Sequence, residues 1–262
     1  MNPIRPWLPQ GTVYGPLLNF RREFELWSPR MTEAPYKAAP KAPVLYVKTA
    51  NTFAACGAEV AVPDAVALGA TLGLVIGNSE SNRPPALVGK APAAMNSEDS
   101  DLPGVLECVL LNDLSLPHTS YYRPAIRYRN RDGFLVCGGL PVPAQALDLS
   151  ALRIDTHVNG MLVQTLDLST LMRDAATLLA DVREFMTLQP GDVLMLGTDC
   201  LSDGSRPLAR AGDRVEIRAA GFEPLVHTLE EESSAAGPPQ GARAPSGGSA
   251  GAAATSVGAR SS

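Results

Sequence analysis

Short runs of aliphatic and β-branched residues recur along the chain and predict strands, because glycine, proline or charged residues bound each of them. The predicted strands are Val44 to Lys48, Leu72 to Gly77, Val105 to Leu111, Val193 to Gly197 and Arg214 to Arg218. A hairpin is predicted over Arg153 to Leu166, where Asn159-Gly160 can supply the positive φ that a type I′ turn needs at both central positions.

One segment has helical periodicity. Between Ser169 and Thr187, apolar residues recur at spacings of three and four, which predicts an amphipathic helix with Ser169 as its candidate N-cap. The helix should end before the turn cluster at Gln189 to Asp192. One long helix among many short strands predicts a β-rich α+β fold. It also argues against a doubly wound parallel sheet, since strands and helices do not alternate.

The two ends of the chain differ from its middle. Residues 233–262 consist almost entirely of Ala, Gly, Ser and Pro, so they cannot bury enough apolar surface to offset the entropy cost of ordering. We therefore predict a disordered tail at 233–262 and a single folded domain at 1–232. Within this domain, residues 1–43 are expected to form an extended segment.

Composition excludes several classes of protein. The chain has 22 Lys and Arg against 27 Asp and Glu, so it shows no basic footprint for nucleic acid. Its apolar runs are too short for a membrane helix, and its start lacks the apolar core of a secretory signal. The four cysteines form no CxxC pair and the three histidines stand alone, which argues against metal sites of those types. We expect a cytoplasmic protein with reduced thiols and neither membrane nor nucleic-acid partners.

A cluster of charged residues is the first candidate for chemistry. It consists of Arg123, Arg127, Arg129, Arg131 and Asp132. Arginine binds carboxylates through paired hydrogen bonds and stays charged when desolvated, so the cluster suits a carboxylate-bearing ligand. The alternative, which these residues alone favour, is a solvated surface with ion pairs. Upstream, Asn112-Asp113 interrupts an apolar run.

Two longer segments carry motifs of a known family. One is LNDLSLPHTSYYRPAIRYRNRDG, from Leu111 to Gly133. The other runs through Asn159-Gly160, Gln164, Met172, Thr187-Leu188, Pro190-Gly191-Asp192 and Gly197-Thr198. In these motifs the chain resembles the fumarylacetoacetate hydrolase family, from about Gly11 to Thr228. Within that family, the segments Ala34 to Lys41 and Tyr121 to Pro124 are most similar to the N-terminal half, or split N-terminal subunit, of the bifunctional isomerase/decarboxylases of 4-hydroxyphenylacetate degradation.

The resemblance implies a fumarylacetoacetase-like mixed β-sandwich or roll and a metal-assisted reaction. In the family, a Glu-x-Glu pair and an Asp hold Mg²⁺, which grips a 2-oxo acid and stabilises an enolate. Asp113 matches the Asp ligand, but Gly69 and Thr71 stand at the Glu-x-Glu positions. The resemblance therefore implies Mg²⁺ for the family, while a single carboxylate in this chain makes a weak metal site.

Further motif positions imply candidate roles. Arg129 replaces the family's KSxD lysine, Asp132 keeps its acid, and Glu23 stands where an N-terminal motif has histidine. We expect Arg129, Arg123 and Thr198 to bind the substrate. Asp132 or Glu23 would move protons.

Three functions remain open on the sequence. In the first, the chain is an isomerase/decarboxylase subunit that decarboxylates 5-oxopent-3-ene-1,2,5-tricarboxylate, isomerises 2-hydroxyhepta-2,4-diene-1,7-dioate, or both. It would work in a homo- or hetero-oligomer beside a second family member with an intact Glu-x-Glu. In the second, the chain is a catalytically degenerate scaffold for such a partner. The third is an autonomous acylpyruvate or fumarylacetoacetate hydrolase, against which Gly69 and Thr71 count.

Overall fold

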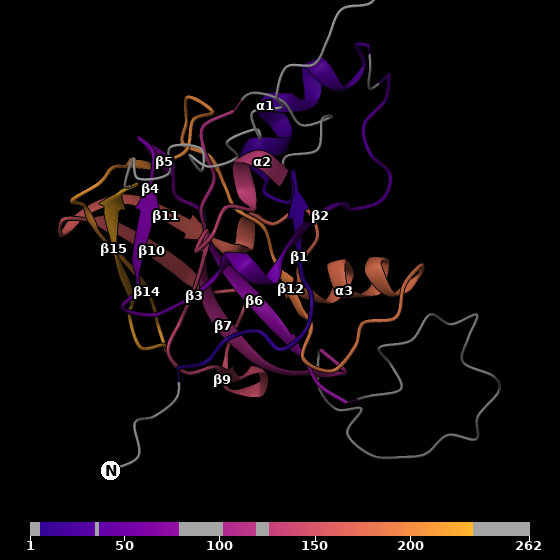
Figure 1. Ribbon diagram of the computed structural model, residues 1–262. Coiled ribbons are helices and arrows are strands. Elements are labelled where there is room, and N and C mark those ends of the chain that lie inside the picture. Colours follow the sequence, from indigo (N-terminus) through magenta and orange to yellow (C-terminus); the bar gives the residue numbers. More distant parts are fainter. Residues whose placement is uncertain (1–5, 35–36, 79–101, 119–125, 233–262) are drawn as a thin grey trace, which may run out of the picture. The chain divides into compact units, whose positions relative to one another are not determined.

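Two β-sheets pack face to face in the computed structural model, which describes residues 6–34, 37–78, 102–118 and 126–232 (Figure 1). The larger sheet has eight strands in the order β2 (Val44–Lys48), β1 (Val13–Leu17), β12 (Val193–Met195), β6 (Ala70–Ile76), β7 (Val105–Asp113), β8 (Leu135–Cys137) and β3 (Phe53–Ala55), with β9 (Val142–Pro143) also paired to β7. The second has five strands in the order β11 (Met161–Asp167), β10 (Arg153–Val158), β14 (Arg214–Ala219), β15 (Leu225–Glu231) and β4 (Glu59–Val62). A separate two-stranded sheet pairs β13 (Leu208–Ala209) with β5 (Val66–Ala67).

Short helices join these strands. The α-helices are α1 (Arg21–Met31), α2 (Ile126–Arg129) and α3 (Ala175–Arg183), and the 3₁₀ turns are η1 (Ala50–Thr52), η3 (Ala144–Ala146) and η4 (Leu168–Thr170). No helix among the described residues is long and apolar enough to cross a membrane. The predicted domain at 1–232 contains all of the described residues, whereas the predicted tail at 233–262 lies outside them.

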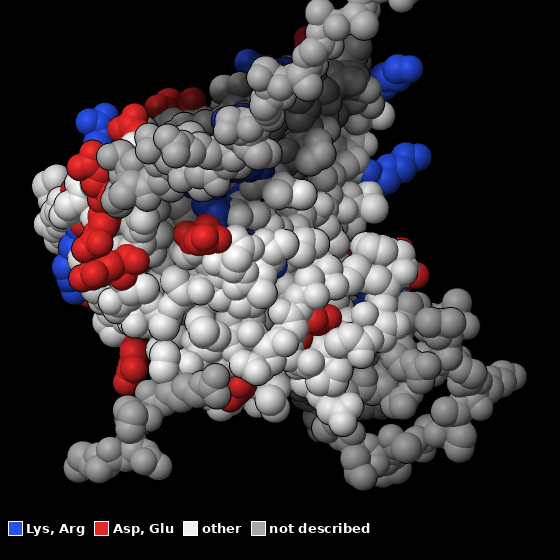
Figure 2. Space-filling view, in the orientation of Figure 1, with Lys and Arg blue, Asp and Glu red and all other residues white. Residues whose placement is uncertain are grey.

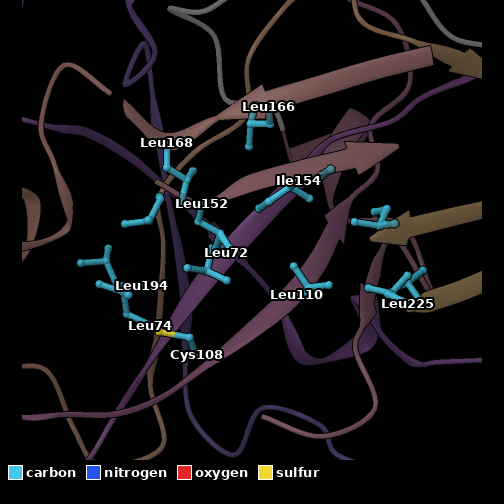
Figure 3. Close-up of a cluster of buried hydrophobic side chains, with 14 of the residues drawn as sticks. Leu72, Leu74, Cys108, Leu110, Leu152, Ile154, Leu166, Leu168, Leu194 and Leu225 are labelled. Atoms are coloured by element: carbon cyan, nitrogen blue, oxygen red, sulfur yellow. The ribbon is translucent and has the colours of Figure 1, made fainter. Parts of the chain in front are cut away.

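The main core lies between the two large sheets. Successive side chains of a strand point to opposite faces, so alternate residues of β6 and β7 enter this core. Figure 3 shows Leu72 and Leu110 of the larger sheet in the same buried cluster as Ile154 and Leu225 of the five-stranded sheet. All seven residues of β6 are buried, because the sheet is covered on both faces, and this explains the unbroken apolar run in the sequence.

The opposite face of the larger sheet holds a smaller core and leads to the charged residues. Leu111 and Val193 are buried there, and Tyr46 packs against them. Asp113 follows Leu111 by two residues, and Lys48 follows Tyr46 by two, so both charged side chains share this face. The pattern of the strands therefore carries a lysine and an aspartate to one end of an otherwise apolar surface.

The β-rich α+β class is confirmed, and each predicted strand coincides with an observed one. The predicted hairpin is also present, with β10 paired to β11 and positive φ angles of 51° at Asn159 and 82° at Gly160. On the outside, Figure 2 shows acidic side chains gathered beside β4 and β15, where Glu59, Glu230 and Glu231 are exposed. Lys and Arg side chains are scattered over the face seen there.

The helix predicted from Ser169 to Thr187 is shorter than expected. The α-helix begins only after Asp174, whose carboxylate accepts a hydrogen bond from the Thr177 backbone N–H at 2.8 Å and acts as the N-cap. Ser169 is not the cap, since its hydroxyl donates to Asp167 within a 3₁₀ turn. A contact distant in sequence explains the delay, because Asn19 binds the backbone N–H groups of Met172 and Arg173 and keeps them out of the helix.

The expectation of an extended segment at 1–43 is wrong. This part of the chain contains β1 and the eleven-residue helix α1, so the fold has two helices of appreciable length instead of one. Phe24, Trp27 and Met31 recur along helix α1 at spacings of three and four, and Met31 is buried. Pro29 lies inside this helix, and proline is ordinarily a signal against a helix interior, so the short apolar stripe did not predict a helix here.

The packing between the sheets can be tested with two leucines of β7. Leu110 is 1% exposed in the main core, whereas Leu106 on the same strand is 57% exposed. We expect Leu110→Ala to lower the free energy of unfolding by about 3 kcal/mol, because it leaves a cavity. Leu106→Ala should change it by about 0.5 kcal/mol or less. Chemical denaturation measures both values, and equal losses would contradict this assignment of the core.

Candidate functional site

Asp113 lies fully buried at the end of β7, and both of its carboxylate oxygens face cations. The Lys48 Nζ atom is 2.9 Å from Oδ1, and the Arg129 Nη1 atom is 2.7 Å from Oδ2. The Tyr46 hydroxyl also donates a hydrogen bond to Oδ2. These partners come from β2 and α2, so one carboxylate joins three elements that are far apart in the sequence.

The sheet explains why Tyr46 and Lys48 reach this point together. They are alternate residues of β2 and therefore point to the same face. In the antiparallel pairing with β1, Tyr46 lies opposite Gly15, and a Cβ atom at Gly15 would overlap the tyrosine ring. Glycine is needed there because the ring occupies that space and stacks under the Arg129 guanidinium, 4.5 Å from its centre.

Lys48 is wholly enclosed by acceptors. Besides Asp113, its ammonium group donates to the backbone carbonyl of Arg129 and to that of Phe134 at 2.8 Å. These bonds satisfy a buried charge that would otherwise be very costly. They also fix Arg129, at the end of α2, against the sheet.

The electrostatics keep Asp113 ionised. Burial raises the pKa of Asp113, but the positive charges of Lys48 and Arg129 outweigh burial and lower this pKa to about 2. Burial, reinforced by the Asp113 charge, raises the pKa of Tyr46, so the phenol stays neutral. Burial lowers the pKa of Lys48, and the adjacent Asp113 opposes that shift. A carboxylate held in this way is an anchor and a poor proton acceptor near neutral pH.

Beside Asp113, a second group of residues surrounds Gly69. The Asp113 backbone N–H donates to the Gly69 carbonyl at 2.8 Å. A Cβ atom on Gly69 would lie 2.9 Å from Thr198 Cγ2 and 3.4 Å from Arg206 Nη1. Arg206 in turn places Nη2 3.8 Å from Oε1 of Glu23. The structure thus brings together Asp113, Thr198 and Glu23, three of the residues that the sequence predicted.

Glu23 is fixed at the start of α1. Its side chain is buried, and its Oε2 atom accepts a hydrogen bond from the Leu18 backbone N–H at 3.1 Å. Asn19 lies next to Leu18, and its amide group donates to the carbonyl of Leu196 at 2.9 Å. The helix therefore begins in contact with the segment that leads from β12 to Thr198.

The arginines of the predicted cluster lie in different environments. Arg129 is buried in the site, but Arg131 pairs at the surface with Glu232 at 2.7 Å, and Arg127 is exposed. For these two, the alternative of a solvated surface is correct. Arg123 lies outside the described residues.

Asp132 does not join the buried group. Its side chain is exposed, and its carboxylate accepts a hydrogen bond from Asn51 Nδ2 at 2.7 Å. The turn after α2 points Asp132 to the surface although it is only three residues from Arg129.

The residues present do not fit a magnesium ion. Gly69 offers no ligand, and the Thr71 side chain is fully buried in the sheet. The oxygens of Asp113 are already engaged by Lys48 and Arg129, so the predicted metal ligand is unavailable to a cation. Among the described residues, no group of three or more His, Cys, Asp or Glu side chains could hold a metal ion.

Several residues of the site carried no clear signal in the sequence. Lys48 ends an apolar strand, where a solvated lysine is the ordinary expectation, and Arg206 lies in a polar turn. Asp199 follows Thr198 directly in the sequence. It is buried, burial raises its pKa, and the Arg22 guanidinium lies 3.7 Å away.

Asn112 and His227 support Gly69 from the side of the main core. The Asn112 Oδ1 atom accepts from the Gly69 backbone N–H at 3.0 Å, so its Nδ2 atom is the donor to His227 Nε2 at 2.9 Å. His227 must therefore be unprotonated at Nε2. Burial lowers the pKa of His227 to about 4, which keeps the ring neutral.

The family model described as fumarylacetoacetate (FAA) hydrolase C-terminal matches residues 12–230 of this chain. The chain belongs to the fumarylacetoacetate hydrolase family. A relative from Escherichia coli, a 4-hydroxyphenylacetate degradation bifunctional isomerase/decarboxylase, is 35% identical over 225 residues, which are 85% of this chain and 48% of that protein. A Sphingomonas relative, 2,4-didehydro-3-deoxy-L-rhamnonate hydrolase, is 29% identical and covers 68% of this chain and 61% of its own length. The chain thus spans about half the length of the first of these curated relatives.

Solved structures support the fold. Fumarylacetoacetate hydrolase from Exiguobacterium antarcticum has a TM-score of 0.63 at 20% identity, covering 86% of this chain and 77% of its own. The 5-carboxymethyl-2-hydroxymuconate delta-isomerase from Mycobacterium smegmatis has a TM-score of 0.61 at 24% identity, with coverages of 87% and 79%. The fumarylacetoacetase-like fold expected from the motifs is confirmed.

Removal of the lysine charge tests the anchor at Asp113. We expect Lys48→Met to lower the free energy of unfolding by about 3 kcal/mol or more, since it leaves a buried carboxylate with fewer compensating charges. Lys41→Met is the matched control, because Lys41 is exposed. Denaturant unfolding compares the two variants, and similar losses in both would refute the anchor.

The neutral state of His227 predicts a pH effect on stability. The unfolded chain takes up this proton near pH 6.5, but the folded protein only near pH 4, so acid favours unfolding over this range. The free energy of unfolding should fall by about 3 kcal/mol between pH 7 and pH 4 on account of this residue. His227→Gln should flatten that slope. An unchanged slope in His227→Gln would contradict a neutral buried His227.

Proposed function

We propose that this chain is an isomerase/decarboxylase subunit of 4-hydroxyphenylacetate catabolism. Its substrates are the unsaturated carboxylates 5-oxopent-3-ene-1,2,5-tricarboxylate, which it decarboxylates, and 2-hydroxyhepta-2,4-diene-1,7-dioate, which it isomerises. The subunit works in an oligomer with a second family member that has an intact Glu-x-Glu pair. The identity to the Escherichia coli isomerase/decarboxylase supports the reaction class.

The observation that carries the proposal is the balance of charge around Gly69. Among the described residues, the positive groups are Lys48, Arg129, Arg206 and the half-exposed Arg22, and the negative groups are Asp113, Glu23 and Asp199. The sum is one positive charge in a largely buried place. A carboxylate substrate completes this balance, whereas an added metal ion worsens it.

Both proposed reactions need the protein to stabilise an enolate and to transfer a proton. Loss of CO₂ moves the electron pair of a C–C bond onto a conjugated carbonyl, and isomerisation moves a proton along the same conjugated system. Each passes through an enolate, which nearby positive charge stabilises and which a positioned acid or base must protonate or deprotonate.

We assign the proton transfer to Glu23 and substrate contact to Thr198. The backbone N–H of Leu18 orients the Glu23 carboxylate, and the Thr198 side chain lies against Gly69. Arg129 contributes positive electrostatic potential without binding the substrate directly, because its guanidinium is already paired with Asp113. Arg123 remains a proposed carboxylate contact outside the described residues. Asp132 takes no part, because its side chain is exposed and bonded to Asn51.

The role of Glu23 can be tested against a neighbour on the same helix. The full chain is mixed with a family member that has the Glu-x-Glu pair, and decarboxylation of the tricarboxylate is followed as CO₂ release. We expect Glu23→Gln to lower kcat by about 100-fold or more, because it removes the proton carrier. Glu25→Gln, whose side chain is exposed, should leave kcat unchanged.

The remaining outcomes separate the alternatives. Full activity of the mixture with Glu23→Gln would refute catalysis by this chain and favour the scaffold. Hydrolysis of acylpyruvates by the chain alone, without decarboxylation in the mixture, would favour the autonomous hydrolase.

A further inference from the structure

The Arg206 guanidinium lies where the family's first metal-binding carboxylate would project. Gly69 occupies that carboxylate position, and a Cβ atom built on it would be 3.4 Å from Arg206 Nη1. The same Cβ would be 2.5 Å from the backbone oxygen of Asp113, so a larger residue requires the backbone to move. The Asp113 backbone therefore leaves no room for a carboxylate side chain at position 69, and the Arg206 guanidinium lies next to the same space.

The backbone holds Arg206 at this position. The next residue, Pro207, accepts a hydrogen bond from the Leu68 backbone N–H at 2.8 Å, directly before Gly69. Pairing of β13 with β5 continues this contact, and the turn before Arg206 is closed by a bond from Leu201 N–H to the Ser205 carbonyl at 2.7 Å. Arg206 thus lies on a short, fixed segment and its side chain is only 12% exposed.

The guanidinium retains capacity for a ligand. Its Nη1 atom is buried and has no hydrogen-bond partner among the described residues. Its Nη2 atom is 3.8 Å from Glu23, too far for an ordinary hydrogen bond. A buried donor without a partner is destabilising, and a planar guanidinium fits a carboxylate through two parallel hydrogen bonds.

We propose that Arg206 is the resident cation of this site, in place of a metal ion, and binds a carboxylate group of the ligand. That the ligand is an unsaturated carboxylate substrate rests on the proposed function, but the binding of a carboxylate by Arg206 does not. Carboxylate binding by this chain should then be independent of divalent cations.

Isothermal titration calorimetry tests this without any catalysis. The full chain, treated with EDTA, is titrated with 2-oxoglutarate and separately with oxalate, and each titration is repeated with Mg²⁺. We expect binding that Mg²⁺ does not change and that Arg206→Gln weakens by about 10-fold or more, as loss of a charged hydrogen bond implies. Arg206→Lys should restore part of the affinity, because it keeps the charge without the paired geometry. Arg210→Gln, at an exposed position nearby, should bind as the unchanged chain does.

Circular dichroism and thermal unfolding establish that each variant is folded, and Arg206→Lys keeps the test valid if Arg206→Gln does not fold. Failure of both probes to bind, binding that requires Mg²⁺, or unaltered binding by the folded Arg206 variants would each overturn the proposal. If the probes bind through Arg206 but the mixture with a family partner does not decarboxylate the tricarboxylate, only the proposed function fails.

Discussion

The site depends on the burial of one carboxylate among cations. Removing Asp113 from water would be prohibitive without compensation, and the compensation comes from Lys48 and Arg129 in direct contact with it. Each of those groups is fixed in turn, Lys48 by backbone carbonyls and Arg129 by the Tyr46 ring. The result is a rigid connection between β7, β2 and α2, in which no member can be neutralised without stranding another charge.

This anchor also determines what kind of chemistry the neighbourhood can support. An aspartate whose oxygens already face an ammonium and a guanidinium cannot also ligate a metal ion, and with a pKa near 2 it cannot take up a proton in ordinary buffers. Under the proposed function, the positive charge that assists the reaction comes from the protein's own cations. A buried excess of positive charge is suited to an anionic substrate and to the enolate formed from it.

The local sequence pattern was sufficient to predict most of the fold but only part of the candidate site. Period-two runs and the Asn159-Gly160 turn located the strands and the hairpin, because both signals act over a few residues. Helix α1 and the delayed start of α3 were not predicted, because Pro29 lies within the apolar pattern of the first and the start of the second is set by Asn19, which is distant in sequence. Motif positions predicted Glu23 and Thr198, and the fold places both beside Arg206 and Gly69. Lys48 and Arg206 could not be identified, because what makes them unusual is burial, which arises only when distant segments pack.

Gly69 and Arg206 act together at the position where the resemblance implies a metal-binding carboxylate. The Asp113 carbonyl lies so close to Gly69 that a side chain there has no room, and the Arg206 guanidinium lies beside the same position. A glutamate introduced at position 69 would form an ion pair with this guanidinium. Its carboxylate would then be bound to the arginine and could not ligate a metal ion. Restoration would require moving the backbone, removing Arg206 and releasing Asp113 from Lys48 and Arg129 together. Under our proposal, a site with a resident arginine and a site with a metal ion are alternative solutions to the same need for positive charge, and this chain uses the first.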